Sequence, residues 1–273
     1  AENNSIWIGS TPTTTDTASY NNAFGEGALD VITTGDYNTA IGYNAATAVT
    51  TAAHTTAIGR EALAATTTGS NNTAIGSRAA QSLILASANN VAISYDAMRD
   101  LTTGSYNIAI GRSTLGSNDD DPAATTSDYN IAIGAFSLMR ISGASSNTAV
   151  GYNAGSGTTT GGFNVSIGAS AGRDNTTGVE NVFVGEEAGG THTTANYNTY
   201  VGQDAGAKST GGSNNVVMGR QAWGVGVGTG GDNVVMGSWA LLSGTSAAEN
   251  VIIGFNAAGN ATTTQRTVVI GND

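Results

Sequence analysis

The sequence predicts an all-β protein, a parallel β-solenoid or β-roll of about sixteen coils with a repeat length of seventeen. Three observations predict this fold. A phrase of the type NTAIGYNAA recurs along the whole chain. One glycine of each copy returns after sixteen to eighteen positions, with a single larger step between Gly111 and Gly134. Gly, Thr, Ala and Asn are abundant, and the apolar residues do not follow the i, i+3, i+4 spacing of helices.

The repeat is described from its recurring glycine, which is position 0 of each coil. Serine replaces this glycine once, at Ser94. The sixteen position-0 residues are Gly9, Gly25, Gly42, Gly59, Gly76, Ser94, Gly111, Gly134, Gly151, Gly168, Gly185, Gly202, Gly219, Gly237, Gly254 and Gly271.

Positions −4 to −1 of each coil form the expected strand. Position −1 is apolar in all sixteen copies, and position −3 is mostly Thr, Val or Ile. Because side chains alternate along a strand, these two positions share one face. We expect that face to fill the interior of the solenoid as an apolar ladder that includes Ile41, Ile75 and Ile110.

The rest of the coil returns the chain to the next strand. The position-0 residue and its two followers are expected to turn, and a second strand is expected from the alanine at +3 through a pair of threonines. The glycines at position 0, such as Gly42, Gly76 and Gly111, are expected either to have φ above zero or to lack space for a Cβ.

Position −4 is asparagine in thirteen copies, among them Asn38, Asn72 and Asn107. Stacked β-structures join such side chains by hydrogen bonds along the stack. The column therefore predicts an amide ladder that runs from coil to coil.

Position −2 points away from positions −1 and −3, and it is alanine in eight consecutive coils. If −1 and −3 fill the interior, the alanines face outward. A small residue that is kept on an outer face is typical of close contact with another β-surface. The sequence thus predicts a subunit interface at Ala40, Ala74 and Ala109.

The domain organisation follows the repeat. Residues 1–16 are expected to form an N-terminal cap or first coil, and residues 17–273 one continuous solenoid domain. The larger step, from Gly111 to Gly134, reflects an insertion at residues 116–127. We expect the insertion to bulge from one side without breaking the stack, because the regular spacing resumes at Gly134 and Gly151.

Composition limits the partners and the chemistry. A net charge of −11 argues against nucleic acid or an anionic membrane as partner. No apolar run approaches the ~20 residues of a membrane-spanning helix.

The two histidines, His54 and His192, are eight coils apart and are each expected on a solvated turn. The G-x-G-x-x-G pattern at residues 226–231 precedes an expected strand, not the helix of a dinucleotide site. We expect no cofactor, no metal and no catalytic residue.

Two groups of residues are candidate ligand contacts. Exposed tryptophans can stack on sugar rings, and Trp223 and Trp239 lie where neighbouring copies have small or polar residues. The alternative is that they pack wider coils near the end of the chain. Asp119, Asp120 and Asp121 lie in the insertion, where a cation or a glycan could bind, with a solvated loop as the alternative.

The repeats NTAIGYNA, YNTAIGYNAA and SNTAVGYNAG resemble those of bacteriophage tail fibres that end in a self-cleaving intramolecular chaperone. They are also similar to repeats in the heads of YadA-like trimeric autotransporter adhesins. The resemblance covers essentially the whole chain, and the period of seventeen fits the tail fibres better. It implies a left-handed β-roll in an elongated homotrimer that is extracellular or on a virion surface and attaches to a cell-surface receptor, which could be a glycan.

Three alternatives remain open. The I-G-x-x-A pattern also matches one hexapeptide of left-handed β-helix acyltransferases, although only a third of each repeat fits. A polysaccharide-degrading tailspike would need paired carboxylates, which no column of the repeat supplies. An ice-binding solenoid would need an unbroken threonine array, and the column Thr39, Thr56, Thr73 ends at Val91.

Overall fold

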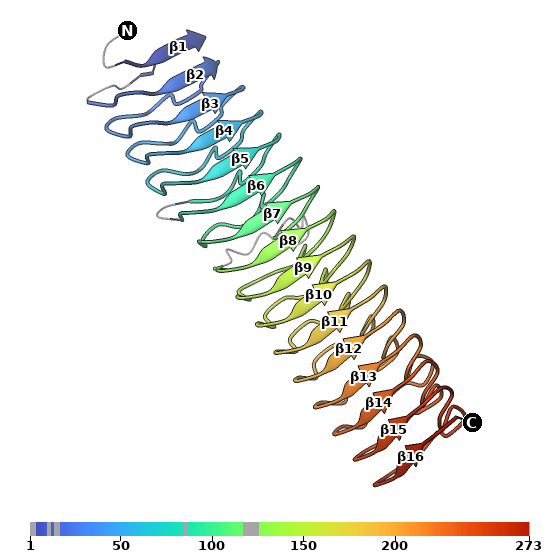
Figure 1. Ribbon diagram of the computed structural model, residues 1–273. Helices are drawn as coiled ribbons and strands as arrows, with labels where there is room; N and C mark the ends of the chain where they lie inside the picture. The colour runs from blue at the N-terminus through green and yellow to red at the C-terminus, as the bar shows by residue number, and fades with distance from the viewer. Residues whose placement is uncertain (1–3, 10–11, 14–16, 85–86, 117–125, 273) are drawn as a thin grey trace. The chain divides into compact units, whose positions relative to one another are not determined.

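The structure is a computed structural model that describes residues 4–9, 12–13, 17–84, 87–116 and 126–272. Sixteen short parallel strands and no helix occur among these residues, and the chain divides into two compact units, residues 1–143 and 144–273. The fold is the predicted parallel β-solenoid (Figure 1). Unit 1 contains β1 (Ile6–Gly9), β2 (Asn22–Gly25), β3 (Thr39–Ile41), β4 (Thr56–Ile58), β5 (Thr73–Ile75), β6 (Val91–Ile93), β7 (Ile108–Ile110) and β8 (Ile131–Ile133). Unit 2 contains β9 (Thr148–Val150), β10 (Val165–Ile167), β11 (Val182–Val184), β12 (Thr199–Val201), β13 (Val216–Met218), β14 (Val234–Met236), β15 (Val251–Ile253) and β16 (Val268–Ile270).

Within each unit, every strand pairs with the next one in the register that the repeat predicts. Ala40 of β3 pairs with Ala57 of β4, for example, so equal positions stack into columns. Across the insertion, Ala109 of β7 pairs with Ala132 of β8 in the same way. The insertion therefore leaves the stack unbroken, as predicted; its residues 117–125 lie outside the described residues.

The return segment differs from the prediction, because it forms a series of turns and not a second regular strand. Its backbone still bonds to the next coil; the N–H of Ala46 donates to the carbonyl of Ala62 at 2.8 Å. The cause is local geometry. Positions +2 and +4 have left-handed φ, 57° at Glu61 and 51° at Leu63, and such residues interrupt an extended conformation.

The interior of the coil is lined by position −2, and the predicted face of the strands is therefore wrong. Ala40, Ala74 and Ala109 have no exposed surface within a single chain, so they do not lie at a subunit interface. Ile41 and Ile75 point outward, with 42% and 37% of their surface exposed. Ile110 also points outward, with 36% of its surface exposed, so the predicted ladder of isoleucines does not fill the interior.

The close packing is visible in how position −2 and position +4 share the interior. Where −2 is alanine, +4 is often a fully buried leucine, as at Leu63. Where −2 is Phe183 or Tyr200, +4 is Gly189 or Gly206. A Cβ on either glycine would lie 2.4 or 2.5 Å from ring atoms of that aromatic side chain. The two aromatic −2 residues of unit 2, Phe183 and Tyr200, are therefore accommodated by glycine at +4 of the same coil.

The asparagine ladder is confirmed. The side-chain oxygen of Asn90 accepts hydrogen bonds from the backbone N–H and the Nδ2 of Asn107, at 3.0 and 3.1 Å. The Nδ2 of Asn107 also donates to the carbonyl of Ser127 at 2.7 Å. Asn38 and Asn72 are buried in the same column, and Asn38 accepts from the N–H of Thr55 at 3.0 Å. Because both protons of the Asn107 Nδ2 are used, this amide joins neighbouring coils without an unpaired donor.

The prediction for the position-0 glycines is confirmed, because these residues have φ above zero and also lack space for a Cβ. Gly42 and Gly111 have φ of 133°. At Gly76, φ is 140° and a Cβ would lie 2.3 Å from the carbonyl oxygen of Ser94. Ser94 itself keeps a φ of 114°, so the one substituted coil retains the glycine conformation at the cost of strain.

Candidate interaction surfaces

The first candidate surface is the outer strand face, defined here as the side chains at positions −1 and −3. Twelve large apolar side chains on this face are at least 36% exposed. None of its thirty-two positions is charged, although the chain has a net charge of −11. Exposed apolar patches of this extent are typical of interaction sites. The twelve are Ile6, Ile8, Phe24, Ile41, Ile75, Ile110, Ile133, Ile167, Met218, Met236, Val268 and Ile270.

A second surface is a row of stacked aromatic rings at position −5. The ring centroids of Tyr20 and Tyr37 are 4.9 Å apart, and those of Tyr37 and His54 are 5.1 Å apart, with nearly parallel planes. Tyr106 and Tyr129 form another such pair at 5.1 Å. Stacked rings cover one another's faces and leave their edges to solvent. The row therefore joins coils, and it places His54 on an exposed turn, as predicted.

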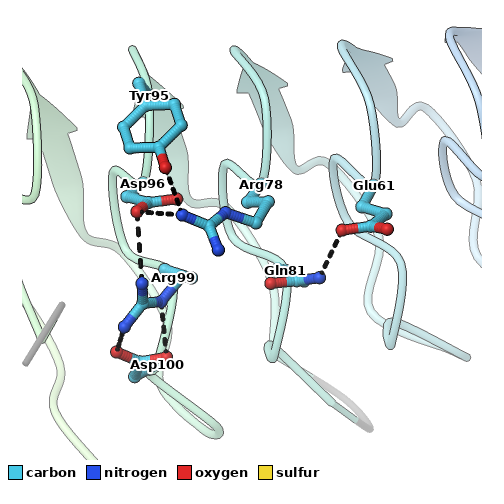
Figure 2. A network of polar contacts seen from close by, with 7 residues as sticks. All are labelled: Glu61, Arg78, Gln81, Tyr95, Asp96, Arg99 and Asp100. Atoms are coloured by element: carbon cyan, nitrogen blue, oxygen red, sulfur yellow. Dashed lines mark hydrogen bonds and ion pairs between the residues drawn. The ribbon is translucent and has the colours of Figure 1, made fainter. Parts of the chain in front are cut away.

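A third feature is a network of charged side chains in unit 1 at positions +1, +2, +5 and +6 (Figure 2). Arg78 forms an ion pair with Asp96 at 2.7 Å and contacts the hydroxyl of Tyr95. Arg99, at +5, pairs with Asp96 at 3.2 Å and with Asp100 at 2.7 Å. The sequence pattern does not single out these residues, because each of their columns varies from coil to coil.

Beside this network, Gln81, also at +5, forms a separate pair by donating to Glu61 at 2.9 Å (Figure 2). The long side chains of Gln81 and Arg99 thus fill the space beside the +2 carboxylates of Glu61 and Asp96. The +2 carboxylates of Glu61 and Asp96 therefore already have hydrogen-bond or ion-pair partners.

The structure separates the two candidate tryptophans. Trp223 is fully buried, and its Nε1 donates to the carbonyl of Gly244 at 2.7 Å. It fills position +4 beside Val217, so the prediction of a ligand contact at Trp223 is wrong. Trp239 is partly exposed, and its Nε1 donates to Gln221 at 2.7 Å. The other candidate group, Asp119, Asp120 and Asp121, lies outside the described residues.

His192 is buried at position +7, which contradicts its prediction as a solvated residue. Its ring packs edge-on against Phe183 and Tyr200, with centroids 5.3 and 5.7 Å apart, and its Nε2 lies 3.1 Å from the carbonyl of Ala195. Burial lowers the pKa of His192, because the charged ring would lose its hydration there. Burial raises the pKa of Tyr200 to about 12 for the same reason.

Within the described ranges, no cluster of three or more His, Asp or Glu side chains is placed to hold a metal ion. No helix of those ranges is long and apolar enough to cross a membrane. Comparison of the chain with protein-family models, with curated proteins and with solved structures finds no match.

Proposed function

We propose that the chain is part of an elongated extracellular attachment fibre, a tail-fibre shaft or receptor-binding region on a virion surface, in which three copies pack through their outer strand faces. The observation that supports this proposal is the outer strand face itself, which is mostly apolar, carries no charged residue and is repeated on every coil. A second copy of the chain presents the same face with the same coil spacing, so parallel copies match in period along their whole length. The number three and the attachment role come from the resemblance of the repeats.

The apolar burial energy available on this face is of the same size as the cost of association. Burying an entire isoleucine side chain stabilises by about 1.5–3 kcal/mol, so covering two-fifths of one contributes about 0.6–1.2 kcal/mol. Twelve such side chains give on the order of 10 kcal/mol per chain, within the ~4–15 kcal/mol that association costs in lost motion. Partly covered −1 and −3 side chains add to this sum.

The test is the mass of the particle in solution, measured by sedimentation equilibrium. The wild-type chain is expected at three times its monomer mass of 27.1 kDa. Ile75→Glu with Ile110→Glu should give a folded monomer, because both side chains are on the surface of the single chain. The control is Thr34→Glu with Thr68→Glu, which adds the same charge to exposed threonines of the return segment. A wild-type monomer, or a double isoleucine variant that keeps its mass, would contradict the proposal.

A further inference from the structure

A polar hollow of about 270 Å³ opens on the return segment of unit 2. Its side-chain lining includes Arg173, Glu187, Asp204, Lys208 and Gln221. The volume is close to the lower end of the ~300–1,000 Å³ that small-molecule sites occupy, so it suits one small ring.

The hollow exists because three consecutive coils have a small residue at position +5. These residues are Gly190, Ala207 and Gly224, and all three line the hollow. The preceding coil has Arg173 at this position and the following coil has Leu242. In unit 1, Gln81 and Arg99 fill the same position.

The +2 carboxylates beside the hollow consequently have unused hydrogen-bonding capacity. Glu187 and Asp204 follow one another in adjacent coils, and Asp204 accepts one long hydrogen bond, 3.4 Å from Gln221. In the described part of the chain, no ion pair joins Glu187, Asp204 or Lys208 to another residue. Arg173, at the end of the hollow, is paired with Asp174 at 2.8 Å.

We propose that this hollow binds a neutral sugar ring of a cell-surface glycan. Sugar hydroxyls both donate and accept, so they can donate to Glu187 and Asp204 and accept from Lys208 and Gln221. Because Asp174 neutralises Arg173, two carboxylates and one ammonium remain, and this net negative charge disfavours sialic acids and uronates. The inference rests on the proposed attachment function, for which it names a receptor site.

The hollow stays accessible in the proposed assembly. It is formed by outward residues of the return segment, which lies across the interior from the strand; Gly206 of that segment faces the ring of Tyr200 from β12. The outer strand face points to the opposite side. Copies that associate through that face leave the hollow open to solvent.

The test uses the full chain on an array of immobilised neutral, sialylated and uronate-containing oligosaccharides, followed by titration calorimetry with the best neutral ligand. Glu187→Gln with Asp204→Asn should weaken binding by about tenfold or more, through the loss of charge-assisted hydrogen bonds. Ala207→Arg should abolish it, because the new side chain can pair with Asp204 as Arg99 pairs with Asp96, and so fill the hollow. The control is Glu61→Gln, which changes a +2 carboxylate in unit 1 beside the side chain of Gln81, and it should leave binding unchanged.

The site is overturned if no neutral sugar is retained, if sialylated or uronate ligands are preferred, or if Ala207→Arg binds as wild type while its melting temperature is unchanged. Sedimentation of the same samples separates this result from the proposed function. A trimer that binds no sugar contradicts the site alone. A monomer whose sugar binding depends on Ala207 contradicts the assembly alone.

Discussion

The shared interior of positions −2 and +4 predicts that two destabilising substitutions in one coil will compensate each other. Tyr200→Ala removes a fully buried ring and should cost about 3–5 kcal/mol of unfolding free energy. Gly206→Leu would place a Cβ 2.5 Å from that ring and should cost about 1–3 kcal/mol. The double variant recreates the Ala57, Leu63 and Thr66 arrangement of unit 1, with Ser209 in the place of Thr66.

Independent effects would sum to about 4–8 kcal/mol, whereas the shared interior predicts that the double variant loses less than Tyr200→Ala alone. Leucine tolerates the required backbone, since φ is 51° at Leu63 and 57° at Gly206. The assay is urea unfolding at fixed protein concentration, followed by far-ultraviolet circular dichroism for the wild type, both single variants and the double variant. Additive losses would refute the account of the interior.

Three further predictions follow from the same columns. Gly168→Val should lower the melting temperature more than Ser94→Val, because a Cβ at Gly168 would lie 2.5 Å from the carbonyl oxygen of Gly185, whereas Ser94 already has a Cβ; equal effects in calorimetry would contradict this. Asn107→Ala should cost about 2–4 kcal/mol in urea unfolding, because it removes the side-chain oxygen that accepts from the buried N–H of Asn130 and the amide that donates to the carbonyl of Ser127; a loss like that of an exposed site such as Thr68→Ala would count against the ladder. For His192, the folded pKa is lowered, so the unfolded chain binds more protons, and stability should fall as the pH drops below about 6.5 and through the folded pKa; His192→Leu should remove this part of the pH dependence of the urea midpoint.

Much of the fold could be predicted from the sequence, because a regular repeat places equal residues in equal positions. The glycine column and the asparagine ladder each have one chemical explanation, and the structure shows both. The side of the strand that faces the core could not be predicted in this way. Alternation shows that Ala40 and Ile41 lie on opposite faces, but it does not show which of them is inside.

Comparing positions across the coil could have corrected this error. Position +4 is leucine or methionine in five of the eight coils with alanine at −2, and it is glycine in both coils of unit 2 with an aromatic residue at −2, which indicates that the two positions face each other. The same comparison places Trp223 at position +4, beside −2. It places His192 at position +7, which is occupied by Ile32 and Leu83 in other coils. The hollow was missed for a different reason. It arises from the absence of side chains at +5 in three adjacent coils, and no motif marks an absence.

The most direct test of the account is cross-linking between single cysteines, because the natural chain has none. Ile75→Cys and Ala74→Cys place a thiol on neighbouring residues with opposite orientations. Treatment with a short bis-maleimide and electrophoresis in denaturant should join Ile75→Cys chains covalently and leave Ala74→Cys chains single. Cross-linked Ala74→Cys with unlinked Ile75→Cys would show that the alanine column, and not the outer strand face, meets the partner chain.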